Sequence, residues 1–208
     1  DLWLAVAGCI SDRFLPDFYE DFKKQFSELV INSDDAFEIL YKSEIGKIAR
    51  IFGFALKDRI TNVINMQKFL MQAKSPYDAL NEIGKNRTMH ERYKEVNKKY
   101  IKFIEKAKDS VKDYKKLLYF QYGGDMSISA DLSNQLSYDF PDKIIVVVYV
   151  SGIKANISAR GKNVRNLILK SIEGIEGATG GGHEEAVGAQ MKSGDLDRFK
   201  ERLVNFVE

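Results

Sequence analysis

The sequence predicts an α/β protein with a helical N-terminal body, a long connecting helix and a compact C-terminal α/β domain with a mixed sheet. Three observations predict this class. In the first 85 residues apolar side chains recur at spacings of three and four, as on one face of a helix. A charged stretch with a regular apolar seam follows, and after Lys116 β-branched runs alternate with glycine-rich turns. The 208 residues suit one or two domains, and we place the boundaries at 1–85, 86–114 and 115–208.

The N-terminal body is expected to be almost entirely helical. The apolar run over residues 1–12 is buried, but periodicity alone does not decide between strand and helix there. Ser75 followed by Pro76 predicts a helix start, because serine caps helices and proline suits the first helical position. The other expected helices in this body span residues 17–30, 36–41, 44–56 and 60–72.

The connecting helix is expected over about residues 88–114. Its apolar and aromatic residues alternate at spacings of four and three, which is typical of a helix that packs along one face. The seam residues are Met89, Tyr93, Val96, Tyr100, Phe103, Ala107, Ser110 and Tyr114. The three tyrosines in this seam are better explained by packing than by stacking on nucleic-acid bases.

The C-terminal domain is expected to alternate strands and helices. The run at residues 144–150 is continuous and β-branched, which indicates a central strand. Ser151-Gly152 predicts a tight turn into a second hairpin strand at residues 153–159. The remaining expected elements are a strand at 117–122, helices at 129–138, 164–172 and 195–207, and a glycine-rich loop at 174–182.

Two short motifs in this domain carry the chemistry. Gly180, Gly181 and Gly182 precede His183, and we expect them to form a loop before a helix start, where backbone N–H groups bind anions. On the strand before it, Ser158 and Arg160 share one side, with the guanidinium placed for phosphate. Each motif alone has a structural explanation, a flexible loop for the glycines and a solvated strand end for the arginine. Together the two motifs favour an anion site.

A strand with Ser-x-Arg, a helix, then Gly-Gly-Gly-His and Ala-x-Gly-Ala resembles the DHH-associated domain, the C-terminal domain of DHH-family phosphoesterases such as the RecJ-like nucleases. The resemblance covers about residues 115–208. It implies that Ser158, Arg160, Gly181, Gly182 and His183 hold a substrate phosphate or terminal nucleotide. Val187 stands where alanine is commoner in the family, a packing change that leaves this assignment unaltered.

The N-terminal segment Leu4–Asp12 resembles the fourth motif of the DHH domain. The resemblance implies that Asp12 is a metal ligand and that residues 1–85 are the C-terminal part of a DHH domain; the alternative is a capping or turn aspartate. The first three family motifs would lie upstream. Two divalent ions, Mn²⁺ or Mg²⁺, serve this chemistry, and one aspartate does not hold both, so we expect the fragment alone to be inactive.

The resemblance implies a metal-dependent phosphodiesterase or exonuclease acting on single-stranded DNA or RNA. A nanoRNase or (cyclic) dinucleotide or adenosine bisphosphate phosphoesterase is the first alternative, and a non-catalytic replication scaffold is the second. The net charge of +2 does not argue for nucleic acid, but basic residues outnumber acidic ones over residues 85–116. That excess fits a nucleic-acid track as well as a solvated helix with i,i+4 ion pairs. With one cysteine, Cys9, and no apolar run long enough for a bilayer, we expect a cytoplasmic protein without a membrane partner.

Overall fold

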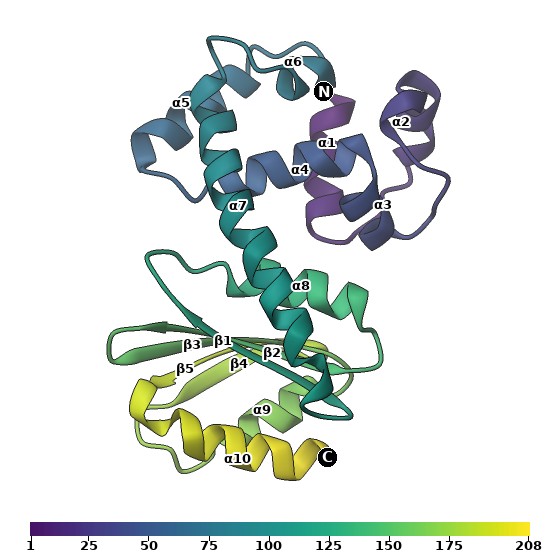
Figure 1. Ribbon diagram of the computed structural model, residues 1–208. Coiled ribbons are helices and arrows are strands. Elements are labelled where there is room, and N and C mark those ends of the chain that lie inside the picture. The colour runs from purple at the N-terminus through teal and green to yellow at the C-terminus, as the bar shows by residue number, and fades with distance from the viewer. The chain divides into compact units, whose positions relative to one another are not determined.

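The fold has two units, Asp1–Lys99 and Tyr100–Glu208, and the boundary between them falls within helix α7 (Arg87–Asp109). The computed structural model describes residues 1–208 and contains helices together with one mixed sheet, as the sequence predicts (Figure 1). A helix that crosses a bilayer needs about 20 apolar residues, and none of the helices here meets that requirement.

The first unit is built around helices α1 (Leu2–Ser11) and α4 (Glu44–Ala55), which pack against each other. The apolar run at residues 1–12 is therefore a helix. The other helices are α2 (Tyr19–Gln25), α3 (Ala36–Lys42), α5 (Ile60–Leu70), α6 (Pro76–Leu80) and the 3-10 turn Ser27–Leu29. One helix at residues 17–30 was predicted, but Phe26 leaves the helical region with φ −136° and ψ 56°, so the helix breaks there.

Helix α7 buries one face, as its seam predicts. Met89, Val96, Tyr100 and Ala107 are buried. The predicted end at residue 114 is wrong, because the α-helix stops at Asp109 and a 3-10 turn, Ser110–Lys112, follows.

The segment that joins α7 to the sheet is held from both sides by two charged side chains. The Nζ group of Lys143 donates to three carbonyls, those of Val111, Tyr114 and Lys115, at 3.1, 2.7 and 2.9 Å. The carboxylate of Glu208 accepts from three backbone N–H groups, those of Lys115, Lys116 and Leu117, at 3.0, 2.7 and 3.1 Å. We call this arrangement the α7–β1 clamp.

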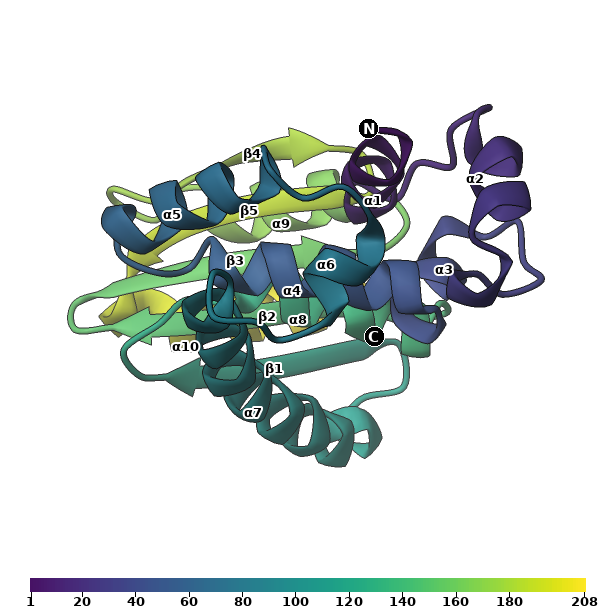
Figure 2. The ribbon, with the colours of Figure 1, turned by 90° about the horizontal axis from the view of Figure 1, so that it is seen from above.

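The sheet of the second unit has five strands in the order β1-β2-β3-β5-β4, which Figure 2 shows from above. Strands β1 and β2 are parallel, and the other neighbours are antiparallel. The strands are β1 (Leu117–Gly123), β2 (Ile144–Ser151), β3 (Lys154–Arg160), β4 (Thr179–His183) and β5 (Ala186–Lys192). Helix α8 (Ser129–Asp139) lies on one face, and α9 (Val164–Ile172) and α10 (Leu196–Val207) lie on the other (Figure 1).

Two sequence predictions for this unit need correction. The glycine-rich segment does not form a loop before a helix; its second half is the edge strand β4, and the residues after it are β5. Glycine has low strand propensity, so pairing with β5 rather than local preference makes β4 a strand. The hairpin turn is also shifted by one residue. Ser151 pairs with Lys154, and Gly152, at φ 58°, forms the turn with Ile153.

Candidate phosphate-binding site

Strand register brings the two predicted motifs onto one face of the sheet. Ser158 pairs with Gly188, which pairs with Gly181; one row further, Arg160 pairs with Ala186, which pairs with His183. Residues opposite each other, or two apart on a strand, point to the same face. All these residues therefore share the face that carries α8. We call the four on β4 and β5 the glycine shelf: Gly181, His183, Ala186 and Gly188.

Helix α8 covers only part of this face, because it packs on β2 and β3. Its side chains orient the two residues of β3. The hydroxyls of Ser129 and Ser158 lie 3.1 Å apart, and Arg160 Nε donates to Asn134 Oδ1 at 2.8 Å. Ser158 and Arg160 are half-buried, whereas β4 is exposed along its whole length. The face thus changes from a helix-covered half to an open half at the edge of β3.

A buried tyrosine fixes the start of α8. Tyr122 Oη accepts from the backbone N–H of Ile128 at 2.7 Å. Burial raises the pKa of Tyr122 to about 12, so its phenol stays neutral at physiological pH. Because α8 carries Ser129 and Asn134, this contact contributes to the orientation of the arginine.

The three glycines of β4 differ in whether the fold requires a residue without a side chain. Gly182 is required by the fold, because its φ is +146° and an added Cβ would lie 2.3 Å from the carbonyl oxygen of Ala186. At Gly180 an added Cβ would lie 3.0 Å from Ile172 Cδ1 on the opposite face. Gly181 has no such cause, since an added Cβ would meet nothing within 4 Å. The fold does not require glycine at this position, and its absence of a side chain leaves room for close approach of a ligand.

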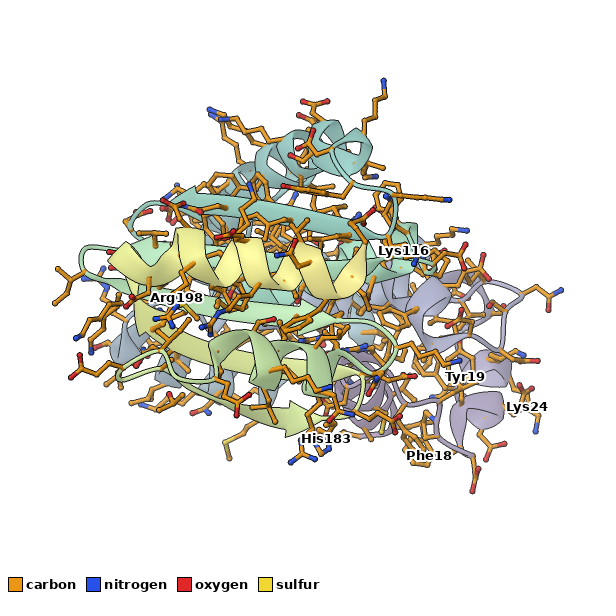
Figure 3. The ribbon with its side chains drawn as sticks, turned by 90° about the horizontal axis from the view of Figure 1, so that it is seen from below. Phe18, Tyr19, Lys24, Lys116, His183 and Arg198 are labelled. Atoms are coloured by element: carbon orange, nitrogen blue, oxygen red, sulfur yellow. The ribbon has the colours of Figure 1, made fainter.

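Arg160 and His183 lie on either side of Ala186. Neighbouring strands are about 4.8 Å apart, so two spacings place their Cα atoms roughly 10 Å from each other. His183 is exposed at the end of β4 (Figure 3). Both side chains can donate to an oxyanion that sits above Ala186.

The turn between β4 and β5 is fixed by backbone hydrogen bonds. The carbonyl of Glu185 accepts from the N–H of Gly161 at 3.1 Å, and that of Glu184 from Arg165 at 3.2 Å. These bonds tie the end of β4, and with it His183, to the connection between β3 and α9.

Asp12 lies in the other unit, directly after α1. It is exposed, and its backbone N–H closes the helix on the carbonyls of Gly8 and Cys9. No group of three or more His, Cys, Asp or Glu side chains is placed to bind a metal ion. The residues of this chain therefore do not fit a complete metal centre, and a role for Asp12 as a ligand stays a prediction.

The basic stretch of α7 is partly paired. Arg87 with Glu91, Arg92 with Glu95 and Lys99 with Glu95 form ion pairs at 2.8, 2.7 and 3.6 Å. All three seam tyrosines are packed. Tyr93 stacks on Phe54, Tyr100 is buried and donates to Gln135, and Tyr114 packs against the core of the second unit.

Sequence reasoning missed Ser129 and Asn134, which position Ser158 and Arg160. A serine and an asparagine on an amphipathic helix carry no signal of their own, and only the packing of α8 on β3 reveals their role. Gly188 also lies in the same row as Ser158 and Gly181.

Comparisons with known proteins agree with this fold. Residues 113–208 match the DHHA1 domain family, and no curated protein sequence matches the chain significantly. The structure of RecJ with Mg²⁺ from Thermus thermophilus is similar over 99% of this chain and 34% of that one, with TM-score 0.66 and 15% identity. A manganese-bound RecJ exonuclease is similar over 99% of this chain and 54% of that one, with TM-score 0.65 and 15% identity. The pGpG-specific phosphodiesterase PggH of Vibrio cholerae is similar over 92% of this chain and 68% of that one, with TM-score 0.56 and 17% identity.

The chain spans about a third of the Thermus RecJ, at 34% of its length. At these identities the structural likeness shows the fold alone. The resemblance found in the sequence is confirmed: residues 113–208 match the DHHA1 domain family, and the chain as a whole has the fold of the matching region of RecJ.

Proposed function

We propose that this chain supplies the phosphate-binding lobe and one metal ligand, Asp12, of a metal-dependent phosphodiesterase that removes nucleotides from single-stranded DNA or RNA. Ser158, Arg160 and His183 hold a substrate phosphate, and Gly181 and Gly182 lie beneath it. The two divalent ions of such an enzyme require ligands beyond this chain.

The observation that carries the proposal is the shared row of Arg160 and His183 on one face of the sheet. Arginine offers a planar array of donors that matches phosphate, and Asn134 already fixes its direction. The RecJ structures contain Mg²⁺ or Mn²⁺, and one of these proteins is an exonuclease. They support the reaction class and the choice of ions.

The proposal is tested by the binding of a fluorescein-labelled single-stranded oligonucleotide to the whole chain, followed by anisotropy. Arg160→Ala should weaken binding roughly 10- to 150-fold, because a charged hydrogen bond contributes about 1.5–3 kcal/mol. Arg198→Ala is the matched control, since this exposed arginine lies on α10, on the opposite face (Figure 3). Equal affinity for native and Arg160→Ala chains would remove the basis of the proposal. With Mn²⁺ added, the chain alone should leave the oligonucleotide uncut.

A dinucleotide-sized substrate is the second candidate. It is favoured by the small extent of the shelf, whose two rows span about 7 Å along the strand. A series of oligonucleotide lengths separates the two candidates. If the substrate is long, neutralising Lys98, Lys99 and Lys102 on α7 should lower affinity for long strands only, whereas a dinucleotide enzyme should bind equally well without these charges.

A further inference from the structure

A polar cavity lies in the first unit, between α5 and the first turn of α7. Its volume of about 370 Å³ falls within the range of roughly 300–1,000 Å³ that small-molecule sites occupy. Three buried apolar side chains, Met66, Phe69 and Met89, contribute to its lining. The cavity is therefore large enough for a planar ligand of nucleotide size and offers it an apolar contact surface.

Five polar side chains of the lining have no partner within the chain. Asn65, Gln72 and Thr88 make no side-chain hydrogen bond, and Lys68 and Lys85 make no ion pair. They are exposed, so solvent satisfies them in the absence of a ligand. Amides that both donate and accept, next to cations, form a set that can bind a base edge and a phosphate.

The lining residue Asn86 is held by hydrogen bonds within the chain. The amide nitrogen of Asn86 donates to the carbonyls of Asp78 and Asn81, each at 2.9 Å, and its oxygen accepts from the N–H of Ile83 at 2.8 Å. Asn86 is 2% exposed. Because all its hydrogen bonds are internal, it holds the wall of the cavity in place and is not counted among the ligand contacts.

The charge of the cavity selects an anion. No carboxylate lines it. Of the neighbouring acids, Asp58 accepts from the lining residue Asn62 at 2.9 Å, and Glu82 pairs with Lys94. Lys68 and Lys85 are therefore the charges that an entering ligand meets.

We infer that this cavity binds a phosphorylated nucleoside. The lysines contact the phosphate, the free amides contact the base edge, and the base lies against the methionines, whose polarizable side chains make favourable contacts with aromatic rings. The ligand is either a free mononucleotide or one nucleotide of a single strand. The second source rests on the proposed nucleic-acid function, and the first does not.

Methionine methyl groups report directly on this site. The chain has five methionines; Met66 and Met89 line the cavity, whereas Met71, 86% exposed, does not, and Met191 belongs to the sheet core of the other unit. With ¹³C-methyl methionine in the whole chain, titration with AMP should shift the signals of Met66 and Met89 and leave those of Met71 and Met191 in place. Inorganic phosphate and adenosine, each alone, are the comparison probes.

Charge reversal provides the matched test. The double variant Lys68→Glu, Lys85→Glu should weaken AMP binding at least tenfold. Lys74→Glu, an exposed lysine of the same unit outside the cavity, should leave it unchanged. Both lysines are exposed. A methyl spectrum of the ligand-free double variant that matches that of the native chain would verify that the variant is folded.

Three results would overturn the inference: no shift of Met66 and Met89 with AMP, a shift equally large with phosphate alone, or binding that survives the double charge reversal. An oligonucleotide that produces the same methyl shifts identifies a strand as the source, and shifts with AMP alone identify a free nucleotide. The Arg160→Ala variant distinguishes failure of the proposed function from failure of this inference. If Arg160→Ala does not weaken oligonucleotide binding, the proposed function fails, but the methyl response to AMP is unaffected.

Discussion

Substituting Gly181 and Gly182 one at a time separates the requirements of the fold from those of the ligand. At Gly181 an added methyl group meets nothing within 4 Å, so Gly181→Ala costs no packing energy. Alanine in place of a strand glycine reduces the entropy of the unfolded chain, and the free energy of unfolding should rise by about 0.5–1 kcal/mol. The new methyl group nevertheless lies on the open face, in the row of Ser158 and Gly188 and next to the row of His183.

Gly182→Ala should behave in the opposite way. A positive φ costs an L-residue about 1–3 kcal/mol, and the 2.3 Å approach to the carbonyl of Ala186 adds an overpacking cost of about 1–3 kcal/mol. The sum of roughly 2–6 kcal/mol is comparable with the stability of a small domain. This variant should unfold at much lower urea concentration, and the loss of the β4–β5 hairpin should abolish binding.

The two measurements are urea denaturation and oligonucleotide anisotropy on the same preparations. We expect Gly181→Ala to retain stability and to lose at least tenfold in affinity. If it binds like the native chain, no ligand approaches the shelf closely and the phosphate assignment is refuted. If both variants are equally destabilised, the distinction drawn from the backbone geometry is wrong.

Two further predictions concern the first unit. Gly46→Ala should destabilise the chain by about 1–3 kcal/mol, because the added Cβ would lie 2.3 Å from two backbone carbonyl oxygens of α3. Gly53, like Gly46, lies in α4, but a Cβ there meets nothing within 4 Å, so Gly53→Ala should be neutral or stabilising. Thermal melts of the two variants test this difference. Burial lowers the pKa of His90 below its ordinary value of 6.5, and its Nε2–H donates to the carbonyl of Ala79 at 3.0 Å. The unfolded chain therefore takes up the proton at a higher pH than the folded one, so stability should be complete above about pH 6.5 and fall as the pH decreases below it. Urea midpoints measured from pH 8 to pH 5 should fall less in His90→Gln, and equal slopes would exclude this histidine as the cause.

The fold was largely predictable because its elements have strong local signals. The β-branched run of β2 and the seam of α7 each depend on side-chain periodicity, which tertiary structure did not override. Strand β4 could not be predicted, since three consecutive glycines have no periodic pattern and low strand propensity, and only hydrogen bonding to β5 orders them.

The candidate site was predictable to the extent that it depends on residue type. Strand alternation identified Ser158 and Arg160, the glycine-rich motif identified His183, and the family resemblance joined them; the register places all three on one face. The contacts from Ser129 and Asn134 depend on how α8 packs across β3, a long-range feature that no local pattern encodes. The metal centre is a different case, because only Asp12 of its expected ligands lies within the chain.

The α7–β1 clamp has a mechanical consequence. The ammonium group of Lys143 binds three carbonyls and the carboxylate of Glu208 binds three backbone N–H groups within a few residues, so two side chains fix six backbone groups at the joint between the helix and the first strand. Force applied along the last turns of α7 is thus transmitted to the edge of the sheet instead of being absorbed in a flexible loop. These turns and the five strands should respond to load as a single stiff element, with bending displaced to positions further back along the helix.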